Sequence, residues 1–352
     1  MTLRFGFLLL IVATPLALSQ SLPSRIDAVF SSLADGKSPG IAVLVRNQGR
    51  TLFQRGYGIR DLRTSAKIDE HTDFRLASFT KQFTAMAAML LIHEGKLQYD
   101  TTLTGIFPDF PAYGRAITVR HLLTHTAGLP DYEDLMDATW TATHQIQDRE
   151  VLALLKEQTA GKFAPGTAWS YSNSAYVVLG LIVAKISGEP FGQFLHNRIF
   201  APLHMTGTLV YVNGENTVPN RAYGHTKRPA GFVETDQSST SATLGDGGIY
   251  SNLADLAQWD EALENHALLT PEEMRPALTP VKLANVSYGF GWYLDPYHAH
   301  TRMWHTGETM GFRTVIERFP SDRLTIVVLC NRTDLDPAPL ALQVAGVFFG
   351  AR

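Results

Sequence analysis

The sequence predicts an α+β protein in which strands from both ends of the chain form one antiparallel sheet flanked by helices. Two apolar runs typical of strands occur close to the start, and several more follow residue 285. The residues between them have a mostly helical pattern, broken by loops rich in Pro and Gly. A mostly helical subdomain is therefore inserted into the sheet-forming part, and a site is expected in the cleft between the two.

The composition is that of a globular protein with a full core. The chain has 352 residues, of which 45% are hydrophobic and 18% are charged. Its formal net charge is −3, and it has no basic stripe or long run of like charges, so we expect no nucleic acid partner. Cys330 is the only cysteine, so no intrachain disulfide can form.

Residues 1–19 have the pattern of a secretory signal peptide. Arg4 provides a positive start, residues 5–18 form an apolar run, and Ala17 and Ser19 are small residues at the two cleavage positions. The run is short for a membrane span and contains a proline. We expect cleavage after Ser19, export to the periplasm or medium, and no stable membrane span afterwards. An uncleaved N-terminal anchor is the alternative.

The first elements after this segment are a helix over residues 24–36 and two strands over 41–45 and 51–57. The strands are apolar, and Asn47-Gln-Gly49 between them is typical of a turn. The long polar stretch 213–246 has few apolar anchors, and we expect it to be irregular and near the surface. The remaining predicted elements are helices over 78–92, 151–158, 175–187, 252–264 and 340–349, and strands over 288–294, 302–305, 313–319 and 324–330.

The helix that begins near Ser78 organises the rest of the chain. It contains no proline, is rich in good helix formers and reaches Gly95, a typical stop signal. Its residues are apolar on nearly every side, which is typical of a helix buried in the middle of a domain. Yet Ser78 and Lys81 lie in its first turn, three residues apart and therefore on one face.

This pair has the chemistry of an activated nucleophile. A hydroxyl needs a base beside it, and burial lowers the pKa of a lysine towards that of a useful base. The helix N-terminus also favours negative charge that develops at Ser78. Ser-x-x-Lys is a short pattern, and most lysines in first helical turns are solvated. Two facts favour catalysis: Ser78 and Lys81 form the only Ser-x-x-Lys in the chain, and they open a buried helix.

Other patterns do not indicate a second site. Gly36-Lys-Ser-Pro-Gly40 matches the Gly-x-Ser-x-Gly nucleophile elbow, but the elbow needs a strand before it and a helix after it, and here the order is reversed. His121 and His125 lie four residues apart without a third ligand nearby, so structural roles are favoured over a metal site. No phosphate-binding glycine loop is present. We expect neither a metal nor an organic cofactor.

Two further motifs follow the serine–lysine pair. Tyr171-Ser-Asn173 lies in a turn with Pro and Gly that leads into a predicted helix. A second Tyr-x-Asn triplet, Tyr211-Val-Asn213, lacks this context. His305-Thr-Gly307 ends a predicted strand, and Gly311 opens the next.

Together the three motifs resemble, in order and spacing, those of the penicillin-recognising serine hydrolases. This family includes class C β-lactamases, DD-peptidases, D-aminopeptidases and related esterases. The similarity covers about residues 41–331 and also takes in Leu122–Pro130, Gly245–Ser251 and Tyr288–Trp292. The resemblance implies a β-lactamase/transpeptidase-like fold for residues 20–352 as a single domain. The α/β part would span about 20–75 and 285–352, and the helical part about 76–284.

The resemblance also implies roles for the first two motifs. Ser78 would be the nucleophile that becomes acylated. Lys81 and Tyr171 would share the proton transfers, and which of them is the base is left open. Asn173 would orient Lys81 and a substrate amide.

For the third motif, the resemblance implies that His305, Thr306 and Gly307 line the strand that binds the substrate. The oxyanion hole would be the backbone N–H groups of Ser78 and Glu308. The β-lactamase pattern has a lysine in place of His305, a permanent cation for a substrate carboxylate, whereas histidine is near neutral at pH 7. We therefore expect weak binding of the penicillin carboxylate, and tighter binding of carboxylates as the pH falls through the His305 pKa.

The implied function is a serine hydrolase that works through an acyl-enzyme. Its substrate would be a D-amino-acid peptide or amide, a β-lactam or a small ester, and transfer to an acceptor other than water would use the same intermediate. The alternative is a catalytically silent binding or scaffolding protein, although all three motifs are intact. We expect a small-molecule or peptide substrate as the partner, and a monomer.

Overall fold

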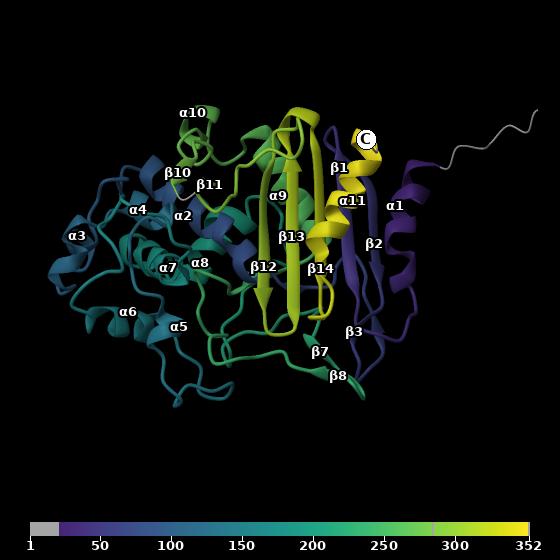
Figure 1. Ribbon diagram of the computed structural model, residues 1–352, viewed down its shortest axis with the longest axis horizontal. Helices are drawn as coiled ribbons and strands as arrows, with labels where there is room; N and C mark the ends of the chain where they lie inside the picture. Colours follow the sequence, from purple (N-terminus) through teal and green to yellow (C-terminus); the bar gives the residue numbers. More distant parts are fainter. Residues whose placement is uncertain (1–20, 284, 351–352) are drawn as a thin grey trace, which may run out of the picture.

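The computed structural model describes residues 21–350 except residue 284, so the predicted signal peptide over 1–19 lies outside the described residues. Five antiparallel strands form the central sheet in the order β12-β13-β14-β1-β2 (Figure 1). The predicted α+β class, with one sheet built from both ends of the chain, is confirmed. The five strands are β1 (Ile41–Asn47), β2 (Arg50–Tyr57), β12 (Met303–Thr309), β13 (Phe312–Phe319) and β14 (Leu324–Cys330).

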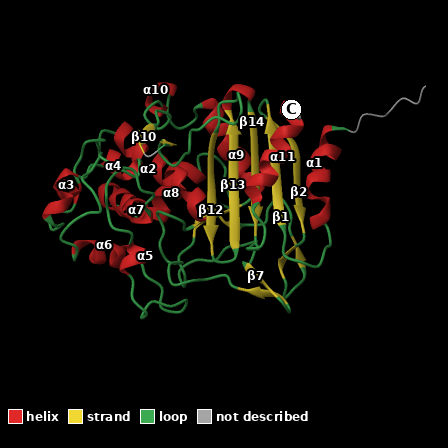
Figure 2. Cartoon of the chain, in the orientation of Figure 1, coloured by secondary structure: helices red, strands yellow, loops and turns green. Residues whose placement is uncertain are grey.

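Helices cover both faces of this sheet (Figure 2). One face packs against α1 (Leu22–Phe30) and α11 (Pro337–Phe349), and the other packs against α9 (Leu253–Asn265) and the helical part. Along β1, Val43 lies in the core next to α1 and α11, whereas Leu44 lies in the core shared with the helical part. Neighbouring residues enter different cores because successive strand side chains point to opposite faces of the sheet. A strand covered on both faces has a continuous apolar sequence, and this made β1 and β14 recognisable.

The helical part is organised around α2 (Lys81–His93), which is buried along its length from Lys81 to Leu91. It packs against α7 (Asn173–Ser187). The other helices are α3 (Leu103–Ile106), α4 (Val119–Leu123), α5 (Tyr132–Leu135), α6 (Asp148–Lys156), α8 (Phe191–Leu195) and α10 (Pro271–Met274), with a π-helical turn over His196–Phe200 and 3-10 turns over Ser31–Leu33, Ala77–Thr80, Ala112–Ala116 and Pro320–Asp322.

Small sheets connect these helices to the central sheet. The strands β5, β9 and β6 form a three-stranded sheet, and three further pairs are hairpins or short ladders. Their bounds are β3 (Ile59–Asp61), β4 (Ala66–Lys67), β5 (Phe74–Arg75), β6 (Leu209–Val210), β7 (His225–Arg228), β8 (Gly231–Glu234), β9 (Ile249–Ser251), β10 (Val281–Leu283) and β11 (Val286–Tyr288).

Several predicted elements differ from the structure. The strand predicted over 288–294 is wrong beyond Tyr288: Gly291 has a φ of +75° and lies against the backbone of α2, so the chain turns instead of extending. The helix predicted over 24–36 is α-helical only to Phe30: a 3-10 turn over Ser31–Leu33 follows, and Asp35 then accepts hydrogen bonds from two backbone N–H groups in the next turn. The stretch 213–246 was expected to be irregular, but it contains the β7–β8 hairpin.

Among the described residues, no single helix is long and apolar enough to cross a membrane. One bent pair, Asn173–Ser187 with Phe191–Phe200, reaches that length and composition only when both helices are counted together.

Candidate active site

Ser78 lies in a 3-10 turn that leads directly into α2, not in the α-helix itself as predicted. The residue before it, Ala77, has a φ of +51°, a left-handed conformation that costs a non-glycine residue about 1–3 kcal/mol. The turn is held on both sides. The Leu76 N–H donates to β9 at 2.8 Å, and the Leu76 carbonyl accepts from the Thr314 hydroxyl at 2.8 Å. In this turn Ser78 is partly exposed and lines a cleft.

Lys81 is the first residue of α2, and its side chain is completely buried beside Ser78. Its Nζ lies 2.9 Å from the Ser78 Oγ, 3.0 Å from the Asn173 Oδ1 and 2.9 Å from the backbone carbonyl oxygen of Asp246. Burial lowers the Lys81 pKa from 10.5 to about 8, against the opposing influence of nearby carboxylates. A lysine with this pKa exchanges protons readily near neutral pH.

The hydrogen bonds around Lys81 also orient its lone pair. A neutral amine has two N–H donors and one lone pair, and the Asn173 Oδ1 and the Asp246 carbonyl can only accept. The lone pair is therefore left to face Ser78, the one partner that can donate. The orientation of the Asn173 amide is fixed in turn, because its Nδ2 donates to the Glu133 carboxylate at 3.2 Å.

The turn that carries Tyr171 and Asn173 begins α7, with the Ser172 hydroxyl accepting from the Ala175 N–H as the helix cap. The Tyr171 ring centroid lies 4.9 Å from the Lys81 Nζ. Burial raises the pKa of the Tyr171 phenol, so its hydroxyl stays protonated at neutral pH. The first two motifs thus meet at one point, as the sequence predicts.

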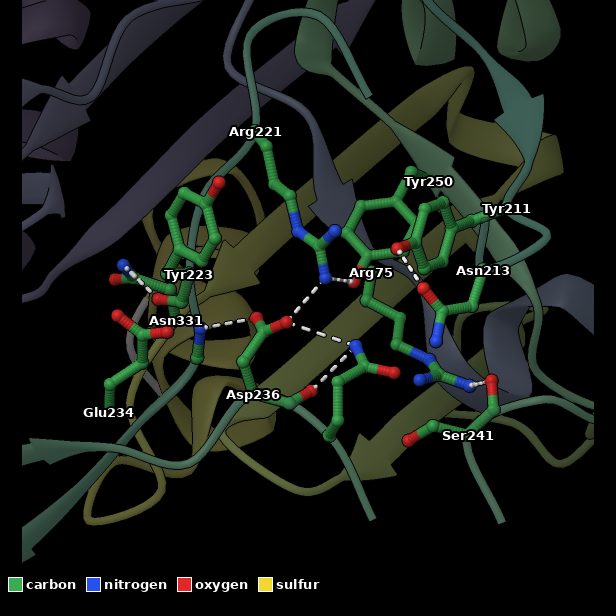
Figure 3. Close-up of polar contacts among 12 residues, drawn as sticks. Arg75, Tyr211, Asn213, Arg221, Tyr223, Glu234, Asp236, Ser241, Tyr250 and Asn331 are labelled. Carbon is green, nitrogen blue, oxygen red and sulfur yellow. Dashed lines mark hydrogen bonds and ion pairs between the residues drawn. The ribbon is translucent and has the colours of Figure 1, made fainter. Parts of the chain in front are cut away.

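The second Tyr-x-Asn triplet lies elsewhere. Tyr211 and Asn213 bond to each other at 3.2 Å, and the Tyr211 ring lies 4.7 Å from the Arg221 guanidinium (Figure 3). Arg221 also contacts the Tyr250 ring and pairs with Asp236, so the second triplet belongs to a cluster of its own. The structure therefore does not bring the second triplet to Ser78.

The third motif lies in the middle of β12, not at the end of a strand as predicted. β12 is an edge strand of the central sheet, and Gly307 packs directly on the turn that carries Ser78. A Cβ at Gly307 would lie against the Leu76 carbonyl and the Thr314 hydroxyl, closer than real Cβ atoms come. A glycine is therefore required here for β12 to approach the turn that carries the nucleophile. This packing requirement is distinct from the substrate contact that the resemblance implies for Gly307.

His305 is buried, with 1% of its surface exposed. Its Nδ1 lies 2.6 Å from the carbonyl oxygen of Thr306 and so donates, which leaves the Nε2 to accept from the Tyr288 hydroxyl at 3.1 Å. Burial, followed by the charge of Lys81, lowers the His305 pKa to about 3. A buried histidine with this lowered pKa is expected to be neutral near pH 7 and to supply no cation there, which counts against carboxylate binding through a protonated His305.

The cleft at Ser78 has an empty volume of about 350 Å³. Glu308, whose N–H is the second expected oxyanion donor, lines the same cleft as Ser78. Thr306 and Gly307 line a separate hollow along β12, which shares Glu308 with the first. The remaining residues around the Ser78 cleft are Arg75, Ala77, Tyr132, Glu133, Asn173, Thr240, Thr243, Asp246, Gly247 and Thr309.

Three residues of the site were missed from the sequence. Glu133 orients Asn173, Asp246 supplies a carbonyl to Lys81, and the His125 Nδ1 accepts from the Ser172 N–H at 3.1 Å. Asp246 lies in a stretch noted only for its resemblance, between two glycines, and this could have identified it. The described residues contain no group of three or more His, Cys, Asp or Glu side chains that could hold a metal ion.

The chain is similar to known proteins over most of its length. Residues 26–346 match the model of a family described as Beta-lactamase. The chain is 30% identical over 333 residues to Penicillin-binding protein 4* of Bacillus subtilis (strain 168), which covers 90% of this chain and 73% of that protein. It is 31% identical over 292 residues to the Putative penicillin-binding protein PbpX of the same organism, covering 82% of this chain and 69% of that protein.

Solved structures share the fold. The D-amino acid amidase from Ochrobactrum anthropi SV3 superposes with a TM-score of 0.80 at 23% identity, over 94% of this chain and 99% of that one. The octameric penicillin-binding protein homologue from Pyrococcus abyssi gives 0.81 at 22% identity, over 95% and 78%. EstCE1, described as a hydrolase with promiscuous acyltransferase activity, gives 0.78 at 23% identity, over 94% and 98%.

Proposed function

The chain belongs to the beta-lactamase family of serine hydrolases, and from this premise we propose that it works through an acyl-enzyme on Ser78. The observation that carries the proposal is the 2.9 Å contact between the Ser78 hydroxyl and the Lys81 amine inside a buried site. A nucleophile and a base within hydrogen-bonding distance are the minimum for acyl transfer, and here the base has a pKa near neutrality.

In acylation, the Ser78 oxygen would attack the substrate carbonyl carbon while the Lys81 lone pair takes the hydroxyl proton. Tyr171, protonated because its pKa is raised, would donate its proton to the leaving group as the bond to that group breaks. The Lys81 ammonium would then return a proton to Tyr171, so that one proton passes in net from Ser78 to the leaving group. In deacylation, water would hydrolyse the acyl-enzyme ester, which releases the acid and restores the Ser78 hydroxyl.

These protonation states favour Lys81 over Tyr171 as the base. The Tyr171 phenol has a raised pKa and loses its proton less easily, whereas burial lowers the pKa of the Lys81 ammonium, which therefore loses its proton more easily. The N–H groups of Ser78 and Glu308 are the proposed oxyanion donors, on two walls of one cleft. Asn173 is proposed to orient Lys81 and a substrate amide. His305 is proposed to support the site from behind, through its contact with Tyr288.

The candidate substrates are D-amino-acid peptides or amides, β-lactams and small esters. Relatives named as penicillin-binding proteins, an amidase and a hydrolase with acyltransferase activity support this range. No cation is supplied by His305, which makes carboxylate recognition of the β-lactamase kind the weakest of these. Export through the signal peptide and a monomeric state stay predictions, and the Pyrococcus abyssi homologue is described as octameric.

The test is to incubate the protein with a fluorescent penicillin and with a chromogenic ester, and to follow intact mass beside Ser78→Ala. A stable adduct on the wild type alone supports a peptidase-like enzyme that deacylates slowly. Ester turnover without an adduct, lost in Ser78→Ala, supports an esterase. Neither adduct nor turnover from folded protein would favour the catalytically silent alternative, and activity that survives in Ser78→Ala would reject Ser78 as the nucleophile.

A further inference from the structure

Asp246 carries a buried charge that its structural contacts do not require. Only 6% of the residue is exposed, and its Oδ2 accepts from the Tyr132 hydroxyl at 3.2 Å. Its Oδ1 is buried without a hydrogen-bond partner among the described residues. A buried carboxylate oxygen without a donor is costly, and a neutral acceptor such as asparagine would hold Tyr132 equally well. The charge itself therefore needs another explanation.

The Asp246 carboxylate has no direct ion pair. Across the part of the chain that the structure describes, no Lys, Arg or His forms one with it. Arg75 lines the same cleft but donates to the carbonyls of Ser241 at 2.9 Å and Gly247 at 3.2 Å (Figure 3). The amine that approaches Asp246 is that of Lys81, whose Nζ lies 2.9 Å from the Asp246 carbonyl oxygen.

The side chain of Asp246 lies close enough to act on the charge of Lys81. The carboxylate and the carbonyl belong to one residue, so the carbonyl contact holds the carboxylate near the amine. Opposite charges within about 4–6 Å of each other favour the ionised forms. Burial lowers the Lys81 pKa to about 8. Three carboxylates oppose this effect on the pKa, and that of Asp246 does so most strongly, followed by Asp131 and Glu133.

Histidine and tyrosine side chains also face Lys81, and they carry no charge at neutral pH. Burial lowers the pKa of His125 and that of His305, so both rings are neutral. Burial raises the pKa of the Tyr171 and Tyr176 phenols, whose ring centroids lie 4.9 Å and 5.6 Å from the Lys81 Nζ. The charge of Lys81 is therefore decided between burial and the three carboxylates.

We propose that the Asp246 carboxylate is the counter-charge that stabilises the Lys81 ammonium as the proton passes to it from the Ser78 hydroxyl. Asp246 is then a positioning residue that acts through Lys81. Its carbonyl accepts from the amine in either protonation state, whereas its carboxylate favours only the charged one. Without the carboxylate, burial would leave a base too weak to hold the proton of Ser78. The inference rests on the proposed acyl-enzyme and adds a side chain outside the three motifs to it.

The first test is the pH profile of kcat/KM for an uncharged ester in Asp246→Asn. Asparagine keeps an acceptor for the Tyr132 hydroxyl but removes the charge. We expect the rise of kcat/KM with pH to occur at least about 0.5 pH unit lower than in the wild type, because the Lys81 ammonium loses its counter-charge. The maximal kcat/KM at pH 9 should fall at least about fivefold and kcat/KM at pH 6 by less, because a weaker base stays neutral at lower pH.

Further variants separate the charge of Asp246 from its structural contacts. Asp246→Glu keeps the charge, and Tyr132→Phe removes the hydrogen bond to Asp246 but leaves its carboxylate. Both should keep the rise of kcat/KM at its wild-type pH, even where the maximal rate falls. Asp246→Ala removes the charge a second way and should shift the rise as Asp246→Asn does. A rise that stays in place when the charge is removed, or that moves equally in Tyr132→Phe, would overturn the proposal.

A titration of Lys81 itself separates this proposal from the proposed mechanism. Lysines labelled with ¹³C at Cε are followed by NMR against pH in folded Ser78→Ala, and the Lys81 signal is identified by its loss on Lys81→Met. Its midpoint, expected at about 8, should fall in the double variant with Asp246→Asn. An unchanged midpoint rejects the counter-charge while leaving the acyl-enzyme intact. A lowered midpoint without a matching shift of kcat/KM supports the counter-charge and rejects Lys81 as the base.

Discussion

The imidazole Nδ1 of His125 accepts a hydrogen bond from the backbone N–H of Ser172 at 3.1 Å, and the His125 carbonyl accepts from the Ser170 N–H at 3.0 Å. The histidine thus holds the chain on both sides of Tyr171. It adopts a left-handed φ of +59° to do so, and its ring packs against the Tyr171 ring at a centroid distance of 4.4 Å. A residue outside the three motifs therefore positions one that belongs to them.

Replacing His125 should reduce both stability and activity. His125→Phe leaves the buried Ser172 N–H without an acceptor, which costs about 1–3 kcal/mol of unfolding free energy. It also releases the Tyr171 turn, so kcat/KM for an ester should fall. His125→Asn tolerates the left-handed backbone and offers an acceptor, and it should recover part of both. Urea unfolding and ester turnover measure the two effects, with the exposed His196→Asn as control. Full activity in His125→Phe would contradict the role.

The rate of acylation should rise with pH up to about 8. The base must be neutral to act, and below its pKa of about 8 the neutral fraction of Lys81 falls about tenfold for each pH unit. The measurement is kcat/KM for an uncharged ester between pH 6 and 9.5. Tyr171→Phe should lower the maximal kcat/KM but keep the rise of kcat/KM with pH up to about pH 8. If that pH-dependent rise disappears in the variant, Tyr171 and not Lys81 is the base.

His305 should not make the preference between a carboxylate-bearing substrate and its neutral ester depend on pH between pH 5 and 8. This preference is the ratio of the two kcat/KM values. Its pKa of about 3 keeps the ring neutral over that whole range. The ratio of the two kcat/KM values, measured across the range, should vary by less than about twofold in the wild type and in His305→Gln alike. A tenfold rise of the ratio on acidification, absent from His305→Gln, would show that the ring does titrate.

Acidification should instead reduce stability through His305. The folded pKa of about 3 lies below the ordinary value of 6.5, so the unfolded chain binds more protons at intermediate pH. The contribution of the neutral ring is complete above about pH 6.5 and is lost as the pH falls towards 3. Urea unfolding of the wild type and His305→Gln at pH 7 and pH 5 measures it, and the variant should lose less stability. An equal loss in both would contradict the assignment.

Gly307→Ala should separate β12 from the nucleophile turn. The added Cβ would collide with the Leu76 carbonyl, which is backbone and cannot rotate away. We expect a loss of about 1–3 kcal/mol of stability, as for other overpacked sites, and a large fall in kcat/KM. Gly346→Ala is the control, since a Cβ there has no neighbour within 4 Å and helix formation favours alanine. Normal turnover in Gly307→Ala would show that the strand can move without cost.

The sequence was most informative where a physical requirement leaves few options. Strands covered on both faces are apolar throughout, and this located β1 and β14. The first two motifs located Ser78, Lys81 and Asn173, which the structure brings into one hydrogen-bonded cluster. Spacing along the chain carries this information because each motif lies within one turn or strand.

What the sequence did not reveal depends on contacts between distant segments. The buried state of His305 follows from Tyr288, seventeen residues earlier. Glu133 reaches Asn173 from the short helix α5, and Asp246 reaches Lys81 through its backbone carbonyl. Gly291 turns the chain where alternation predicted a strand, because α2 lies against it. Among these contacts, only that of Asp246 has a local signature, the two glycines beside it.

The position of β1 has a consequence for the order in which the molecule can form. Gly40, just before β1, donates to the Asn331 side chain at 2.7 Å, and these residues are 291 positions apart. β1 is the first strand to be synthesised, but it can pair with β14 only when synthesis is almost complete. Pairings between such distant segments make folding slow. Until then β1 has one unpaired edge, which is a site for mispairing with other chains. A chain that stops before β14 would lack the partner of β1 and the neighbour of β13, so catalytic competence is expected only when synthesis is essentially complete.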